Sequence, residues 1–211
     1  MRNRIAVIAV VTSALSMAAC LEKETTHALY LSPGGQVAWT VLEQNVRSDK
    51  ENAAEESEYL ASALAGTSDV ARGLDALEAS RVQTRVLRRE RPFTVMVEAR
   101  FPSVEALAKQ IMAECRLNGD AYLTSENGTV TLHIHLDFRG PEPESGNDSP
   151  VEAMLESIDS YRIVLTEGRF VEAVGFTLNG DQTIAAPIGV SEEEIDAMGG
   201  VLELSLTWRV S

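Results

Sequence analysis

The segment AYLTSENGTVTLHIHLDF, residues 121–138, contains the clearest fold-determining pattern in the chain. Apolar and polar residues alternate over 121–125 and again over 129–138, which is typical of strands with one buried face. Asn127-Gly128 lies between the two runs, and this dipeptide readily adopts the backbone conformation of a two-residue hairpin turn. The segment therefore predicts an antiparallel β-hairpin.

Further strands are predicted on both sides of this hairpin. In the closing segment 201–210, Leu204, Leu206 and Trp208 alternate with polar residues, as in a half-exposed strand of an antiparallel sheet. The remaining strands are expected over 28–32, 36–47, 82–90, 93–101, 161–166, 170–178 and 182–186, and helices over 49–65, 69–79, 104–116, 150–160 and 192–198. We therefore expect an α+β fold, with a largely antiparallel β-sheet and helices packed mainly on one face of it.

The N-terminus has the three parts of an export signal. Arg2 and Arg4 precede the apolar run Ile5–Ala19, which only three hydroxyl residues interrupt. This run is shorter than the roughly 20 residues that a helix needs to cross a bilayer. A charged start, a short apolar middle and small residues at the end predict a secretory signal peptide.

The end of this segment, Met17-Ala18-Ala19-Cys20, resembles the lipobox of bacterial lipoprotein signals. The resemblance implies that the chain is cut before Cys20 and that acyl chains are attached to this cysteine. Two or more acyl chains hold a protein stably on a bilayer, so the membrane becomes a partner through the lipid on Cys20. The implied location is the cell envelope, and Leu21 after the cysteine favours the outer membrane, facing the periplasm, in a cell that has one. A plain secreted protein with a chance cysteine at this junction is the alternative.

These boundaries divide the chain into three parts. Residues 1–19 are the signal peptide that is removed, residues 20–27 form a polar lipid-anchored tether, and residues 28–211 form a single α+β domain. The polar loop 139–149 is the one plausible internal boundary, but the segment after it has too few strands for a core of its own. Beyond the signal, the body is faintly similar to small bacterial α+β lipoproteins of unassigned function, and this likeness transfers no functional residue.

The acidic composition restricts the partners of the chain. Its 211 residues include 18 Lys and Arg against 32 Asp and Glu, which gives a formal net charge of −14. An acidic body repels nucleic acid and anionic lipid surfaces, so we expect no nucleic-acid partner and a membrane attachment through the acyl chains. Cys115 is the only cysteine besides Cys20, and its place on the apolar face of the 104–116 helix predicts a buried structural thiol.

His133-x-His135-x-Asp137 is the sharpest cluster of groups that can perform chemistry. Alternate side chains of a strand share a face at about 7 Å per step, so the three are expected to project together. Imidazole and carboxylate groups are reasonable zinc ligands, although a closed site needs a further ligand and His27 is the only other histidine. The alternative is that the three residues form the solvent-facing side of the sheet.

A second cluster, Arg85, Arg88, Arg89 and Arg91, is basic in an otherwise acidic chain. It is a candidate site for a phosphate, a lipid headgroup or a carboxylate partner. Alternatively, these arginines neutralise nearby acidic helices and keep an edge strand from pairing with other molecules.

Three functional hypotheses follow from these features. The sequence motifs of common enzyme classes are missing, so the first hypothesis is a non-catalytic protein of envelope assembly or partner binding, with no cofactor. The second is a carrier or sensor of an apolar ligand or lipid, which requires an apolar cavity of several hundred Å³. The third is a metal-dependent enzyme built on His133, His135 and Asp137.

Overall fold

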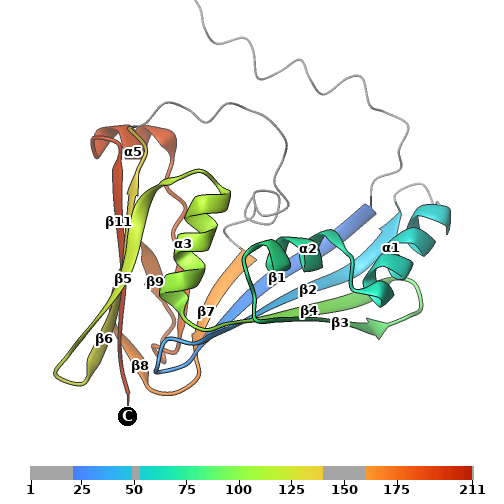
Figure 1. Ribbon diagram of the computed structural model, residues 1–211, viewed down its shortest axis with the longest axis horizontal. Coiled ribbons are helices and arrows are strands. Elements are labelled where there is room, and N and C mark those ends of the chain that lie inside the picture. Colours follow the sequence, from blue (N-terminus) through green and yellow to red (C-terminus); the bar gives the residue numbers. More distant parts are fainter. Residues whose placement is uncertain (1–20, 49–52, 140–159, 211) are drawn as a thin grey trace, which may run out of the picture.

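The structure, a computed structural model, describes residues 21–48, 53–139 and 160–210. Within these residues, eleven strands form two sheets (Figure 1). The larger sheet has the strand order β3-β4-β2-β1-β7-β10-β9, and the smaller sheet has the order β5-β6-β11-β8. The predicted signal peptide, Cys20 and most of the helix predicted over 150–160 lie outside the described residues.

The bounds of the elements are as follows. The larger sheet contains β1 (Leu21–Leu31), β2 (Val37–Ser48), β3 (Arg81–Arg88), β4 (Phe93–Phe101), β7 (Tyr161–Leu165), β9 (Phe176–Leu178) and β10 (Ile184–Pro187). The smaller sheet contains β5 (Asn118–Glu126), β6 (Thr129–Asp137), β8 (Arg169–Val174) and β11 (Val201–Arg209). The helices are α1 (Ala53–Ala65), α2 (Asp69–Ala76), α3 (Val104–Glu114) and α5 (Glu192–Ala197).

The pairing confirms the predicted α+β class. Every described strand pair is antiparallel except β1 with β7. The strands form two sheets, however, and not the single sheet that the alternation suggested. Periodicity identifies a strand by its own side chains and contains no information on which strands become its neighbours.

Helices α1 and α2 cover one face of the larger sheet (Figure 1). The covered face is apolar because buried and less buried residues alternate along β4 and along β2 from Val37 to Glu43, with Trp39, Val41 and Val97 fully buried. These side chains belong to the same buried cluster as Leu74 of α2. Helix α2 begins where the Ser68 hydroxyl accepts a hydrogen bond from the Ala71 N–H.

Strand β1 begins at Leu21, so the polar tether predicted over residues 20–27 is wrong from Leu21 onward. The first half of β1 pairs with β2, although it has no apolar alternation of its own. Charged groups hold it there instead, because Lys23 forms an ion pair with Glu43 of β2. Cross-strand ion pairs of this kind stabilise a strand whose sequence shows no alternation of apolar and polar residues.

The hairpin predicted at Asn127-Gly128 is confirmed. Strands β5 and β6 pair antiparallel up to Glu126 opposite Thr129. Asn127 has a φ of 51° and Gly128 a φ of 77°, the two consecutive positive values of a tight hairpin turn. The closing strand β11 lies in the middle of the smaller sheet, between β6 and β8.

The two sheets meet at the turn between β1 and β2. Trp208 of β11 is fully buried, and its Nε1–H donates to the carbonyl oxygen of Pro33 at 3.2 Å. In the same turn, a Cβ placed on Gly35 would lie 3.2 Å from Cδ1 of Leu123 in β5, so the turn packs against the smaller sheet. One cluster of buried apolar side chains includes both Trp39 of the larger sheet and Trp208 of the smaller sheet.

Among the described residues, no helix has the length and apolar character needed to span a membrane.

Candidate functional site

Strand β6 presents His133, His135 and Asp137 at alternate positions, as predicted, but each side chain has a different partner. The His133 ring stacks on Tyr122 of β5, with ring centroids 4.8 Å apart, and its Nε2 lies 3.2 Å from the Thr124 hydroxyl. These contacts come from the neighbouring strand of the hairpin. His133 is therefore held as part of a cross-strand pair.

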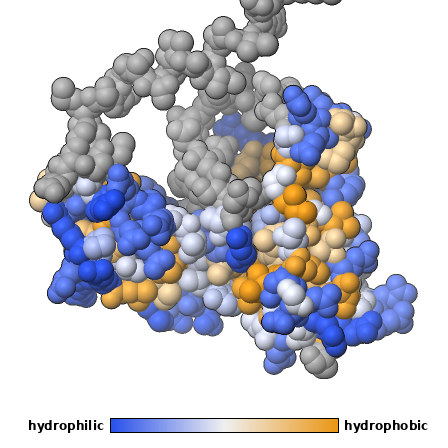
Figure 2. Space-filling model, turned by 180° about the vertical axis from the view of Figure 1, so that it is seen from behind, coloured by the Kyte–Doolittle hydropathy of each residue, from blue (hydrophilic) through white to orange (hydrophobic). Residues whose placement is uncertain are grey.

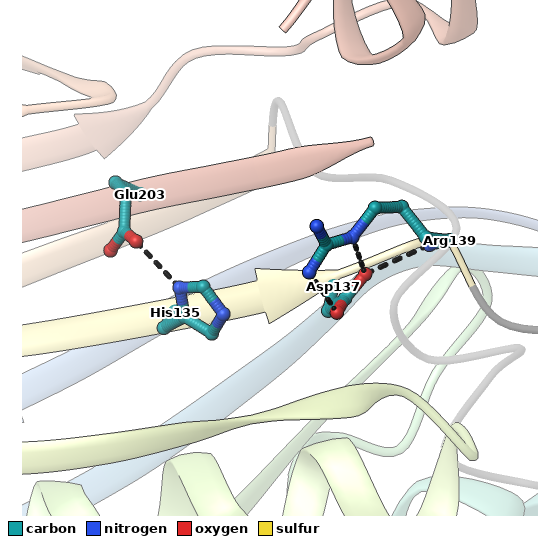
Figure 3. Close-up of polar contacts among 4 residues, drawn as sticks. All are labelled: His135, Asp137, Arg139 and Glu203. Carbon is teal, nitrogen blue, oxygen red and sulfur yellow. Dashed lines mark hydrogen bonds and ion pairs between the residues drawn. The ribbon is translucent and has the colours of Figure 1, made fainter. Parts of the chain in front are cut away.

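The other two residues are engaged on the opposite side of β6 and beyond its end (Figure 3). Nδ1 of His135 lies 2.5 Å from Oε1 of Glu203 in β11. Asp137 accepts two hydrogen bonds from the Arg139 guanidinium, at 2.8 and 2.6 Å, and a third from the Arg139 backbone N–H at 2.9 Å. These hydrogen bonds, together with the positive charge of Arg139, hold the pKa of Asp137 far below its usual value.

This arrangement uses the donor atoms that a metal would need. Asp137 is occupied by Arg139, and the two histidines contact separate groups on β5 and β11. In the part of the chain that the structure describes, no three His, Cys, Asp or Glu side chains are placed to hold a metal ion. The geometry favours the solvent-facing interpretation of this strip over the zinc interpretation.

We expect that His133→Ala leaves the zinc content of the purified protein unchanged and lowers its stability by no more than about 1 kcal/mol. The reason is that the variant removes one half-exposed cross-strand stacking pair, which is worth roughly 0.2–1 kcal/mol. Metal analysis together with urea unfolding checks both parts. Stoichiometric zinc that disappears in the variant would contradict this interpretation.

The predicted arginine cluster lies on the outer strand of the larger sheet and in the turn that follows. Arg85 and Arg88 belong to β3, while Arg89 and Arg91 lie in the connection to β4. Arg91 forms an ion pair with the buried carboxylate of Glu56 in α1, which agrees with a neutralising role for this one arginine. Within the described residues, Arg85, Arg88 and Arg89 form no ion pair.

This turn lies at the same end of the larger sheet as the start of β1 (Figure 1). The register places Leu21 opposite Ser48 at one end of β2, and Val46 of β2 opposite Phe93 at the start of β4. We call residues 87–91, at the tip of the β3–β4 hairpin, the arginine tip. The arginine tip and the residue that follows Cys20 therefore lie at the same end of the larger sheet, with β4 and β2 between their strands.

A buried acidic group near Leu21 was not predicted. Glu43 of β2 is 1% exposed, forms an ion pair with Lys23 and accepts a hydrogen bond from the Tyr59 hydroxyl at 2.9 Å. Burial, followed by the charge and hydrogen bond of Glu43, raises the pKa of Tyr59. Glu43 continues the inward-facing series of Val37, Trp39 and Val41, and this position in the alternation was the available signal.

Glu43 lies at the base of a pocket of about 290 Å³ beside the start of β1. The pocket has a mixed lining with many charged groups, and this lining includes Leu21, Lys23, Glu55, Glu58, Asp69 and Arg72. Charged groups of both signs lie around this pocket, as is usual for a protein surface with exposed ion pairs. It lacks the apolar lining that a lipid or apolar ligand requires.

His27, predicted to lie in the tether, is instead 2% exposed in the core of the larger sheet. Its Nδ1 accepts a hydrogen bond from Nε1–H of Trp39 at 3.2 Å, and its ring stacks on Tyr161 with centroids 4.2 Å apart. Burial lowers the pKa of His27 to about 4, so the ring is neutral at pH 7. Cys115, at the end of α3, packs partly buried against the same core and near Tyr161.

Comparisons with known proteins identify no family for this chain. No family model matches it, and no curated protein matches it. Among solved structures, it is similar to the NMR structure of the folded domain of Mycobacterium tuberculosis LppM. The TM-score is 0.37 at 10% sequence identity, covering 94% of this chain and 95% of that domain. A likeness at this level supports no conclusion about the function of the chain.

Proposed function

We propose that the chain is an exported lipoprotein that holds a non-catalytic α+β body at a membrane of the cell envelope, where the body binds a protein partner. The observation that carries the proposal is that Leu21, the residue after Cys20, is already paired in strand β1, opposite Ser48 of β2. The apolar segment 5–19 therefore ends just before the folded body begins. Cleavage before Cys20 would remove that segment and leave β1 intact.

Acylation of Cys20 supplies the attachment. A single acyl chain binds a bilayer only marginally, and two or more chains give stable anchoring. Because β1 follows the modified residue at once, the lipid would hold the Leu21 end of the larger sheet close to the headgroups. By the lipoprotein resemblance, Leu21 also favours the outer membrane, facing the periplasm, in a cell that has one.

An exposed apolar surface away from this end supports the partner-binding part of the proposal. Seen from behind, apolar side chains gather over the half of the molecule that contains the smaller sheet (Figure 2). Among the exposed apolar side chains, Val174 of β8 lies near Ile188, since the Ile188 N–H donates to the carbonyl of Gly175, the residue after Val174, at 3.0 Å. Contiguous exposed apolar side chains rimmed by polar ones are typical of protein contact sites.

The pocket of about 370 Å³ at the other end of β1 and β2 does not favour a carrier of apolar ligands. Apolar or aromatic residues make up one half of its lining and polar residues the other half: Tyr30, Val37, Ala38, Phe101 and Pro102 against Ser32, Gln36, Ser80, Arg100 and Thr166. A carrier site buries most of its ligand against apolar groups and uses only a few polar ones. The mixed lining found here fits a surface depression.

The anchor is tested by growing cells that express the full chain with a clickable fatty acid. We expect the wild-type protein and Cys115→Ser to incorporate the label and Cys20→Ser to incorporate none, because only Cys20 follows the lipobox. Cys115→Ser is the matched control, since these are the two cysteines of the chain. Intact-mass measurement should show loss of residues 1–19 together with added acyl mass. An unmodified protein that retains Met1 would refute the proposal.

A further inference from the structure

We propose that the arginine tip, residues 87–91, docks on the anionic lipid headgroups of the membrane that holds Cys20. This inference rests on the proposed lipid anchor and adds a second, electrostatic contact to it. Three features support it: the position of the tip, the chemistry of its side chains and the charge of the rest of the chain.

The position of the tip follows from the sheet order. Strand β3 is separated from β1 by β4 and β2, which gives three strand spacings of about 4.8 Å, or about 14 Å in total. Both the start of β1 and the β3–β4 turn lie at the same end of this sheet (Figure 1). A bilayer reached by an acyl chain on Cys20 is therefore within reach of the tip.

The side chains of the tip suit the interface of an anionic bilayer. Leu87 is 56% exposed, although it is a large apolar residue, and Arg88 and Arg89 beside it are exposed and form no ion pair within the described residues. Guanidinium groups form bidentate hydrogen bonds with phosphate, and an apolar side chain among them can enter the boundary between headgroups and acyl chains. Protection of an edge strand explains Arg85 and Arg88 on β3, but not Arg89, which lies beyond the end of the strand.

Charge asymmetry gives the docking its direction. The chain has a formal charge of −14, so most of its surface is repelled by anionic lipids. In the segment Arg85–Arg91, four arginines are opposed only by Glu90, and Arg91 is additionally paired with Glu56. An acidic body with this basic tip turns the tip toward the lipid surface and the remainder away from it.

The test uses the full acylated protein in vesicles, with Leu87→Trp as a reporter. The native Trp39 and Trp208 are fully buried and provide a constant background. Phosphatidylcholine brominated on its acyl chains quenches tryptophan that enters the boundary between headgroups and acyl chains. We expect strong quenching of Trp emission in vesicles that also contain phosphatidylglycerol, and little quenching in phosphatidylcholine alone or in 0.5 M NaCl, where screening shortens the range of the attraction. Tyr122→Trp, at an exposed position of the smaller sheet, is the control and should stay unquenched.

Charge variants in the Leu87→Trp background separate docking from mere proximity. Arg88→Gln/Arg89→Gln should shift the docking equilibrium roughly 30-fold toward the undocked state, from the usual contribution of a basic residue near an anionic surface. The control variant Arg169→Gln/Arg209→Gln removes the same charge from two arginines that lie opposite each other on β8 and β11 of the smaller sheet. It should leave the quenching unchanged. Quenching that is equal in neutral and anionic vesicles, or absent in both, would overturn the proposal. Intact-mass measurement of the same protein tests the lipid anchor separately, because a protein without the anchor lacks the added acyl mass.

Discussion

Trp208→Ala is expected to lower the free energy of unfolding by about 3–5 kcal/mol, the usual cost of truncating a fully buried tryptophan. Trp208 is 0% exposed and lies in the cluster that joins the two sheets. The substitution also leaves the Pro33 carbonyl without the indole donor that now reaches it at 3.2 Å. Urea unfolding followed by circular dichroism measures the loss.

The control for this prediction is Trp208→Phe, which keeps most of the apolar contact and loses only the hydrogen bond to Pro33. It should cost markedly less than the alanine variant, with about 1 kcal/mol of the loss arising from the hydrogen bond. If the sheets were independent, the alanine variant would unfold in two separate steps, with the larger sheet unaffected. That result would contradict the shared core.

Acid is expected to destabilise the protein by about 3 kcal/mol through His27 alone. Burial lowers the pKa of His27 to about 4 in the folded protein, against about 6.5 in an unfolded chain. Above pH 6.5 the ring is neutral in both states and has no effect on the pH dependence. Between pH 6.5 and 4 the unfolded state binds a proton that the folded state does not, so stability falls as the pH falls. Below pH 4 both states are protonated and the loss is complete.

His27→Gln isolates this contribution, because the amide can still accept the hydrogen bond from Trp39 and does not titrate. The variant should be less stable than wild type at pH 7, since it loses the stacking on Tyr161. The difference between the two proteins should then shrink by about 3 kcal/mol as the pH is lowered from 7 to 4. Urea unfolding at a series of pH values measures it. A difference that does not change with pH would show that the pKa of His27 is the same in the folded and unfolded states, which would contradict the effect of burial.

Local chemistry explains which parts of the fold were predictable. The hairpin at Asn127-Gly128 and the start of the helix at Asp69 depend on residues a few positions apart, and both are confirmed. The first half of β1 depends on Lys23 meeting Glu43, 20 residues further along the chain. No local pattern contains that pair, so the sequence by itself predicts a polar tether there.

The same limit applies to the candidate sites. Alternation correctly put His133, His135 and Asp137 at successive alternate positions of one strand, but their partners Tyr122 and Glu203 come from other strands. The burial of His27 likewise depends on Tyr161, which reaches it only through the parallel pairing of β1 and β7. Cys20 and the signal peptide lie outside the described residues, and their roles stay predictions.

The place of β11 between β6 and β8 has a consequence for biosynthesis. Until Val201–Arg209 has left the ribosome, β6 and β8 lack the strand that pairs with both of them. The carbonyl of Pro33 also lacks the hydrogen bond that Trp208 donates to it. Pairings between residues so far apart in the chain also form slowly. A newly made polypeptide of this design therefore completes its tertiary structure only after its last strand has been synthesised.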